Sequence, residues 1–286
     1  MTTRKAIASL LTCFTCLFLH AQTGPFAQAC FGYGLPVICR ELNSNYEADS
    51  SGNFHDEGVY GSYGAGISAG IGLGFDFCEN GGGQLGFSWL NGKKYEYTDV
   101  EQIFGDFSGT YTEQARGFYL EPQARLFTAH DDHPITWFLR AGLLLPVGVK
   151  LIRDIHETSE DLFSTTVTDG TLEGKSSMNI GFSGAGGGIF HVNDRIGIFA
   201  EANVRAISLS WSTAEYTEFT STYNSNFGGD PVITSLADLD VADKQFEFVK
   251  VITDADNQDE NQPTKQLKDY YPFSSAGINV GIEFRF

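Results

Sequence analysis

The sequence is poor in basic residues and, after its first 21 residues, in long apolar runs. It has 286 residues with 18 Lys and Arg against 36 Asp and Glu, a formal net charge of −18. Non-specific nucleic-acid binding needs clustered basic residues against phosphates, so we expect no nucleic-acid partner. A membrane-spanning helix needs roughly 20 consecutive apolar residues. Because no such run follows residue 21, a mature chain in a membrane would not cross it as helices.

The N-terminal segment is typical of a secretory signal. Arg4 and Lys5 precede an apolar run at residues 7–19, and the small residue Ala21 occupies the cleavage position. The run is too short for the alternative, a membrane-spanning helix. We therefore predict a signal peptide at residues 1–21 and a single mature domain at residues 22–286.

Apolar and polar residues alternate through much of the mature chain. A strand has a period of two, so each alternating segment is one strand with two chemically different faces. Eight segments alternate in this way: residues 29–42, 59–77, 84–89, 118–126, 135–147, 177–183, 196–212 and 276–286. Within residues 196–212 the apolar phase slips near Ala206, which predicts a β-bulge there.

The connections between these segments alternate in length. Short turns are expected at residues 78–83, 129–134 and 191–195, and long connections at residues 43–58, 100–113, 154–174 and 213–270. Short periplasmic turns and long extracellular loops are typical of outer-membrane barrels. Closure is required because lipid offers no hydrogen bonds to an open sheet edge.

We therefore predict an all-β fold, an eight-stranded antiparallel transmembrane β-barrel in the bacterial outer membrane, with both termini periplasmic. Outer-membrane lipid and lipopolysaccharide would surround it. A soluble, secreted β-sandwich is the competing fold, but it does not explain why the connections alternate in length. Aromatic residues favour the two membrane interfaces. We expect Trp137, Phe75, Phe77, Phe284 and Phe286 at the periplasmic interface, and Tyr63, Tyr95, Tyr97, Trp211 and Tyr271 at the extracellular one.

The chain ends in INVGIEFRF, in which one face of the strand is apolar. That face comprises Ile278, Val280, Ile282, Phe284 and Phe286. This terminus resembles the C-terminal signal of small bacterial outer-membrane β-barrel proteins, of the kind of the OmpA membrane domain and OmpX. The resemblance implies that the barrel-assembly machinery recognises these five residues. PorT-like outer-membrane barrels are a further relative on fold analogy. Because this fold hosts several functions, the resemblance assigns no catalytic residue.

The polar faces of the strands carry charges that would point into the barrel. The inward charges are Glu121, Arg125, Arg140, Glu201, Arg205, Glu283 and Arg285. An unpaired buried ion costs several kcal/mol, and an eight-stranded barrel is just wide enough for its side chains to fill. We predict a structural ion-pair network that fills the lumen. The alternative is a narrow, gated path through it.

No motif for catalysis, a cofactor or a metal site stands out. The glycine-rich residues 64–74 and 181–190 do not open a helix, as a phosphate-binding loop must. His55 and His156 each lie beside a carboxylate, but neither has a nucleophile at an obvious strand spacing. Export would allow a disulfide. Cys30 and Cys78 are the candidate pair, because both would lie near the same end of neighbouring strands.

The connection at residues 213–270 is long and acidic. Its segment DADNQDE, residues 254–260, offers oxygen ligands for Ca²⁺, but it lacks the turn glycine and the bidentate Glu spacing of a calcium loop. We predict a solvated acidic tip there. The alternating segment KQFEFVKVI, residues 244–252, predicts an extracellular strand paired with residues 216–219.

These features predict a non-enzymatic integral outer-membrane protein with a structural or interaction role. Its ion-paired lumen would be filled, and its extracellular loops would contact a protein partner. A minor alternative is a component of a secretion or envelope complex. The main alternative is a narrow passive channel for small or apolar solutes, like OmpW-type barrels. Too few inward apolar residues, Leu90, Phe138, Leu144 and Phe199, are present to line an apolar tube.

Overall fold

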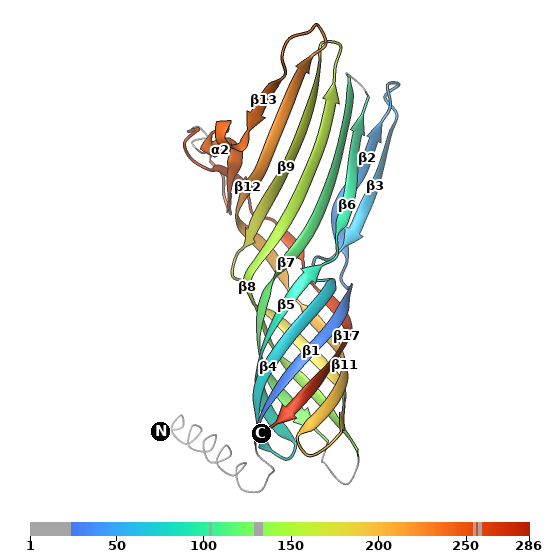
Figure 1. The fold of residues 1–286 in the computed structure, drawn as a ribbon, viewed down its shortest axis with the longest axis vertical. Helices are drawn as coiled ribbons and strands as arrows, with labels where there is room; N and C mark the ends of the chain where they lie inside the picture. The colour runs from blue at the N-terminus through green and yellow to red at the C-terminus, as the bar shows by residue number, and fades with distance from the viewer. Residues whose placement is uncertain (1–23, 103–104, 129–133, 254–255, 257–258) are drawn as a thin grey trace.

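The chain forms a barrel that continues into an open sheet (Figure 1). The structure, a computed structural model, describes residues 24–102, 105–128, 134–253, 256 and 259–286. The predicted signal peptide, residues 1–21, lies outside the described residues. Within the described part, no helix has the length and apolar character that crossing a membrane requires.

Eight strands close the barrel, at the end of the molecule that holds the C-terminus (Figure 1). Around the ring the order is β1, β4, β5, β7, β8, β10, β11, β17 and back to β1, and every pairing is antiparallel. The bounds are β1 (Gly24–Pro36), β4 (Gly66–Cys78), β5 (Gly81–Gly92), β7 (Asp106–Phe127), β8 (Ile135–Glu160), β10 (Gly181–His191), β11 (Ile196–Ala206) and β17 (Ser275–Arg285). The predicted all-β, eight-stranded antiparallel barrel is confirmed.

The barrel strands have the length that a bilayer requires. Six of them contain 11 to 13 residues. At about 3.3 Å per residue they are roughly 36–43 Å long, and a tilt of about 45° reduces their height to roughly 26–30 Å. The hydrocarbon core of a bilayer is about 30 Å thick. The other two strands, β7 with 22 residues and β8 with 26, are far longer, and they extend beyond the ring.

The outward side chains of the ring are apolar on every strand. One exposed large apolar residue from each strand in turn is Phe31, Ile71, Phe87, Leu126, Leu139, Phe190, Ile198 and Ile282. A soluble domain does not expose a continuous apolar band of this kind. The five aromatic residues expected at the periplasmic interface are also exposed, near the end of the barrel that holds the C-terminus.

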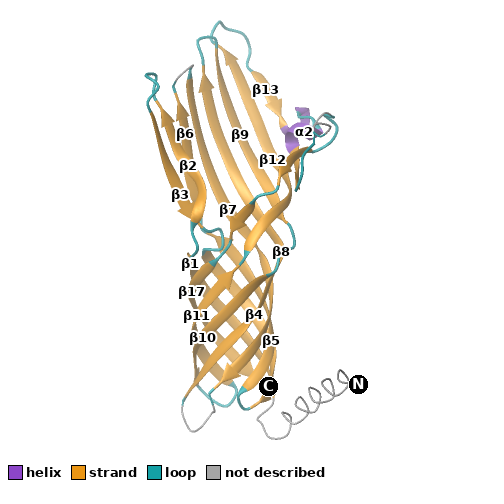
Figure 2. Ribbon diagram, turned by 180° about the vertical axis from the view of Figure 1, so that it is seen from behind, coloured by secondary structure: helices purple, strands orange, loops and turns teal. Residues whose placement is uncertain are grey.

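The four long connections predicted between the barrel strands are present, but they are not simple loops, because each of them contains strands. They form a second sheet, called here the distal sheet, which is open (Figure 2). Its strands run in the order β3, β2, β6, β7, β8, β9, β12, and β13 and β14 then flank β12. The additional elements are β2 (Arg40–Ala48), β3 (Phe54–Gly61), β6 (Tyr95–Glu101), β9 (Ser164–Ser176), β12 (Ser208–Ser225), β13 (Val232–Ser235), η1 (Leu236–Asp238), α2 (Val241–Lys244), β14 (Gln245–Val249), β15 (Thr264–Leu267) and β16 (Tyr270–Pro272).

The chain crosses over itself between the barrel and the distal sheet. In the ring β4 lies between β1 and β5, whereas in the distal sheet β2 lies between β3 and β6. The predicted strands at residues 29–42 and 59–77 are therefore each broken in two. At the crossing Gly66 has φ +134°, and a Cβ there would lie 2.7 Å from the Cα of Gly92. Only glycine combines this backbone conformation with so close an approach.

Two further predictions about the strands need correction. β10 begins at Gly181, so Met178 and Ile180 lie just before it. The bulge predicted near Ala206 lies further along the chain: the pairing of β10 with β11 runs without a register shift up to Ala206, the last residue of β11, and β12 has a register shift between Trp211 and Thr213. Another register shift lies between β7 and β8, near Gly148, which has φ +69°.

Candidate functional site

A buried ion pair lies in the part of the lumen nearest the C-terminus. Arg125 Nη2 and Glu283 Oε2 are 2.6 Å apart, and the two side chains are 0% and 1% exposed. Three aromatic rings surround the guanidinium, with centroids 4.7 Å (Phe26), 4.4 Å (Phe127) and 5.1 Å (Phe138) from its Cζ. A desolvated guanidinium is attracted to ring faces, so this cage holds Arg125 in place.

Glu283 is the centre of this end of the lumen. Besides Arg125, Gln28 donates to it at 2.8 Å and Arg285 Nε donates to it at 2.8 Å. Arg285 also pairs with Asp76 at 3.4 Å. Asp76 is a lumen residue that the sequence analysis did not include, although it lies on the inward period of its strand. Together with Asp76, the seven inward charged residues give four Arg and four carboxylates, so the formal charge of the lumen is zero.

Two further ion pairs lie deeper in the barrel. Arg140 pairs with Glu201, which also accepts a hydrogen bond from Asn279 at 2.7 Å. Arg205 pairs with Glu121 at 3.1 Å. The structure thus brings all seven charged residues selected from the sequence together inside the barrel, in ion pairs with one another.

Neutral polar side chains connect these pairs. Gln123 donates to Glu121 at 3.1 Å and to Ser183 at 2.8 Å, and it accepts a hydrogen bond from Gln84 at 2.9 Å. Ser88 donates to Glu121 at 2.6 Å. Buried polar groups are stable when they have hydrogen-bond partners. The network supplies partners for many of the polar atoms in the lumen, but Arg125 Nε and Nη1, Arg140 Nε and Glu201 Oε2 are buried without one.

Two apolar clusters also fill the lumen, one within the network beside Arg125 and one beyond it. Near the C-terminal end, Phe138, Ile189 and Phe199 form one buried cluster. At the other end a larger cluster closes the barrel where the distal sheet begins, and we call it the plug. Its members are Tyr63, Leu90, Tyr95, Ala115, Tyr119, Leu144, Val149, Leu151, Ile207, Leu209, Trp211 and Phe273.

The predicted extracellular aromatic belt was wrong: Tyr63, Tyr95 and Trp211 belong to the plug, and Tyr271 is partly buried against it. Tyr63, Tyr95, Tyr97 and Trp211 are 0%, 5%, 6% and 2% exposed, so none of them faces lipid. Apolar residues change from the outward to the inward side where the strands leave the barrel, because the inward side becomes the core there. This change of side produced the apparent phase slip in the sequence near Ala206.

A buried carboxylate lies just above the plug. Glu113 is 1% exposed. It accepts hydrogen bonds from Arg153 Nε at 2.6 Å, from the Tyr97 hydroxyl at 3.2 Å and from the Tyr63 hydroxyl. Burial alone would lower the pKa of Arg153, but Glu113 beside it raises that pKa above its ordinary value. Arg153 is therefore charged, and its contact with Glu113 links the plug to the distal sheet.

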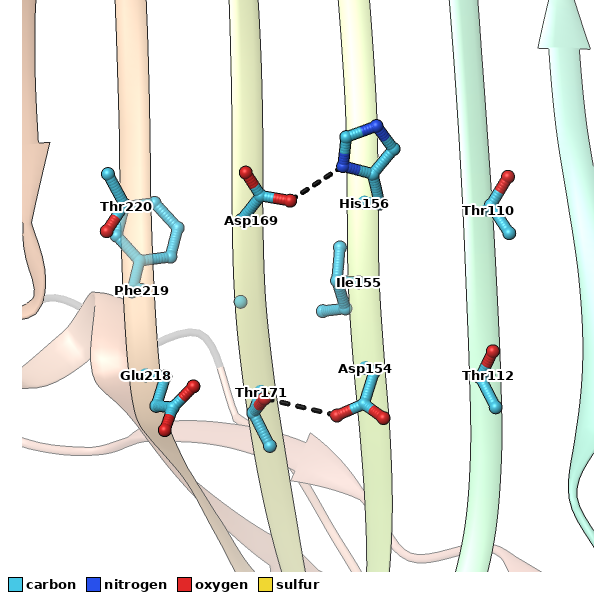
Figure 3. Close-up of a pocket in the computed structure, with 11 residues that line it drawn as sticks. Thr110, Thr112, Asp154, Ile155, His156, Asp169, Thr171, Glu218, Phe219 and Thr220 are labelled. Atoms are coloured by element: carbon cyan, nitrogen blue, oxygen red, sulfur yellow. Dashed lines mark hydrogen bonds and ion pairs between the residues drawn. The ribbon is translucent and has the colours of Figure 1, made fainter.

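The outer face of the distal sheet carries a shallow polar hollow of ≈ 380 Å³ (Figure 3). In it His156 Nδ1 lies 2.6 Å from Asp169 Oδ1, and Thr171 donates to Asp154 at 3.1 Å. His156 and Asp169 have side chains that are 60% and 64% exposed. The hydroxyl groups in the lining belong to threonines on neighbouring strands, and in the described part of the chain no group of three or more metal-ligating side chains occurs. We assign no catalytic role to this solvated pair.

Cys30 and Cys78, the candidate disulfide pair, are too far apart to be joined. Cys30 of β1 lies opposite Gly70 of β4, and Cys78 lies eight residues further along β4. At about 3.3 Å per residue the two Cα positions are roughly 26 Å apart. A disulfide needs Cα atoms within about 7 Å. Both thiols are free in the structure.

The C-terminal strand closes the ring. β17 pairs with β1 on one side and with β11 on the other. The five residues of the proposed assembly signal all point outward, and Ile278 and Phe286 are the most exposed, at 65% and 72%. The strand that would be recognised during assembly is thus the one whose pairing with β1 completes the barrel.

The acidic connection at residues 213–270 folds against the distal sheet. β14 pairs with β12 at residues 213–215, three residues earlier than predicted. Asp256 pairs with Lys265 at 2.6 Å, and this hydrogen bond, with those from Thr253, lowers the pKa of Asp256 to about 2. Residues 254, 255, 257 and 258 lie outside the described part, so the predicted acidic tip at residues 254–260 is described only in part.

Comparison with known proteins adds little to this description. No family model matches the chain, and no curated protein matches its sequence. A crystal structure of Neisserial surface protein A (NspA) is 11% identical, with 92% of this chain and 97% of that chain covered and a TM-score of 0.35. The TodX deltaS2S3 mutant monoaromatic hydrocarbon channel is 8% identical, with 95% and 92% covered and a TM-score of 0.19. At such low TM-scores neither likeness supports an argument, so the fold class rests on this chain's own strand pairing.

Proposed function

We propose that this chain is a non-enzymatic β-barrel protein of the bacterial outer membrane, which anchors the distal sheet at the cell surface for contact with a partner. The observation that carries the proposal is the closed ring with an apolar band on all eight strands around a lumen of paired charges. Only a ring without edges satisfies the backbone of a sheet in lipid.

The lumen favours an anchor over a channel. Its ion pairs and hydrogen bonds join side chains from opposite sides of the barrel, and the plug fills the mouth below the distal sheet. A conducting path needs water along its whole length, and the plug residues that such a path would have to pass are only 0–6% exposed. The alternative, a narrow passive channel, would require these layers to rearrange.

The orientation in the membrane follows from the same features. β1 and β17 pair antiparallel, so the start of β1 and the end of β17 lie at the same end of the barrel. The short connections lie at that end, and the distal sheet lies at the other. We infer that the former is periplasmic and the latter extracellular, surrounded by lipopolysaccharide at the barrel rim, and that assembly machinery reads β17.

Expression in a bacterial host, followed by membrane fractionation, tests the location. The chain should appear in the outer membrane as a heat-modifiable band, and protease added to intact cells should remove the distal sheet and leave a protected barrel. Recovery of a fully soluble chain, or complete protease resistance of intact cells, would contradict the proposal.

Planar bilayers test the closed lumen. The purified barrel should give background conductance. The double variant Trp211→Ala with Tyr63→Ala removes two large side chains from the plug, and it should raise the conductance only if ions can also pass the ion-pair network. A matched control changes Asp169→Asn on the outer face of the distal sheet. Steady conductance by the unmodified protein would favour the channel alternative. Co-purification in mild detergent would then show whether a stoichiometric envelope complex contains the protein.

A further inference from the structure

An apolar row crosses the inner face of the distal sheet, the face that carries Glu113 and Arg153. Residues paired across neighbouring strands point to the same side of a sheet. Register therefore identifies the row, whose members are Tyr97 of β6, Tyr111 of β7, Ile155 of β8, Gly170 of β9 and Phe219 of β12. The rings of Tyr97 and Tyr111 stack at 4.9 Å between centroids.

This row is incompletely covered. Tyr111, Ile155 and Phe219 are only partly buried, although they lie in the middle of a wide sheet. In the described part of the chain, β8 and β9 pack closely only against strands beside them in the sheet or the ring. The apolar face of a sheet is normally covered by another layer. An uncovered row in the middle of the sheet therefore indicates a surface that binds something.

The next row towards the tip of the sheet is acidic. It contains Asp99 and Glu157, followed by Thr168 and Ser221. Neither carboxylate forms an ion pair among the described residues. The Tyr111 hydroxyl donates to Glu157 at 2.7 Å, so the apolar and acidic rows are in direct contact.

The distal part of the chain holds nearly all of the net charge. Residues 37–65, 93–116, 148–176 and 208–272 contain 28 Asp and Glu against 11 Lys and Arg, a net charge of −17. A second copy would bring the same charge to the contact, and phosphate-rich surfaces are also anionic. Like charges brought together are repelled. The occupant that complements this surface is cationic.

We propose that the inner face of the distal sheet binds a basic, extended polypeptide segment of a partner protein. The proposal deepens the proposed function and rests on it, because it requires the distal sheet to lie outside the membrane. Side chains of an extended segment alternate in direction. A segment lying across the strands would place apolar side chains on Tyr111, Ile155 and Phe219, and Lys or Arg side chains on Asp99 and Glu157.

The dimensions agree with this arrangement. Five strands at a spacing of about 4.8 Å are roughly 19 Å across, which about six extended residues span. The partly exposed ring of Tyr111 also attracts Lys and Arg through cation–π contacts. The same surface therefore offers apolar contact, ring faces and carboxylates within the reach of one short segment.

Fluorescence anisotropy with the detergent-solubilised full-length barrel tests the proposal. The probes are three labelled ten-residue peptides of alternating sequence: Lys–Val, Lys–Ser and Glu–Val. The Lys–Val peptide should bind most tightly of the three. Its affinity should fall as the salt concentration rises, because salt screens the charges. Asp99→Asn with Glu157→Gln should weaken it about tenfold, the combined value of two exposed ion pairs.

The matched control is Asp154→Asn with Glu218→Gln, which removes the same charge from the opposite face of the sheet (Figure 3). This variant should bind within about twofold of the unmodified protein. Equal weakening by both variants, or equal binding of the Lys–Val and Lys–Ser peptides, would overturn the proposal. All variants are first checked for the heat-modifiable band. A folded outer-membrane barrel that binds no peptide refutes this inference alone, whereas a chain absent from the outer membrane refutes the proposed function.

Discussion

Replacing Glu283 with alanine should destabilise the folded barrel by about 3–5 kcal/mol, the cost of breaking a buried ion pair from one side. Glu283 is 1% exposed and accepts hydrogen bonds from Arg125, Gln28 and Arg285. Its removal would leave Arg125, whose side chain is 0% exposed, without its carboxylate partner. The charge could reach water only if the packed lumen opened.

Removing both charges should cost much less. Arg125→Met with Glu283→Leu keeps the volume and leaves no buried charge from this pair, so we expect a change within about 1–2 kcal/mol of the unmodified protein. Arg125→Met alone should fall in between, because Glu283 would still pair with Arg285. It would also lose the contacts of the guanidinium with three rings.

Reversible urea unfolding in lipid vesicles, followed by tryptophan emission, measures these free energies. The heat-modifiable band shows that each variant has folded before it is titrated. A cost below about 1 kcal/mol for Glu283→Ala, or a double variant less stable than that single variant, would refute the argument. Either result would mean that water reaches Arg125 and that the lumen is not packed as described.

Three further predictions concern other parts of the chain. Phe286→Ser should slow conversion to the heat-modifiable form in pulse-chase experiments, yet change the final stability by less than about 1 kcal/mol, because the side chain is 72% exposed. Gly66→Ala should destabilise the barrel by about 1–3 kcal/mol in urea titrations, because φ at this position is +134°. Gly72→Ala is the control and should be tolerated, because the nearest atom to an added Cβ is 3.8 Å away. Burial and the hydrogen bond to Glu157 raise the pKa of Tyr111 in the folded protein. Above about pH 10 the folded protein therefore keeps a proton on Tyr111 that the unfolded chain loses, so the free energy of unfolding should fall as the pH rises beyond about 10. Emission from Trp211, isolated by replacing the other two tryptophans with Phe, should report that loss, and an unchanged midpoint at pH 11 would contradict it.

The barrel was predictable from the sequence because lipid imposes a strict rule on each strand. Outward residues must be apolar, and the strand period of two then places Glu121, Arg125 and Glu283 inward without ambiguity. Which charges pair was not predictable, since partners such as Arg125 and Glu283 are far apart in the sequence and meet only through the closed ring. Asp76 lay on the inward period and could have been included on that ground alone.

The distal sheet was not predictable in the same way. Its strands have water on their outer face and polar residues such as Thr110 and Asp169 there, so their alternation does not resemble that of a spanning strand. Their inner face mixes aromatic residues with Glu113 and Glu157, which weakens the pattern further. Predicting loops from long polar connections fails when those connections pair with strands that continue out of the barrel, as β7 and β8 do.

The side on which apolar residues lie marks the boundary between the two parts. Along β11 and β12 the apolar residues are outward at Ile196 and Ile198, which are 37% and 52% exposed, and inward at Leu209 and Trp211, which are 0% and 2% exposed. A strand that stayed in lipid could not make this change, because its outward side would lose its apolar residues. A strand that was never in lipid would not expose the apolar side chains of Ile196 and Ile198. The change of side therefore supports a membrane exit close to Ala206, and it places the plug, the Glu113–Arg153 pair and the acidic inner face in sequence beyond it.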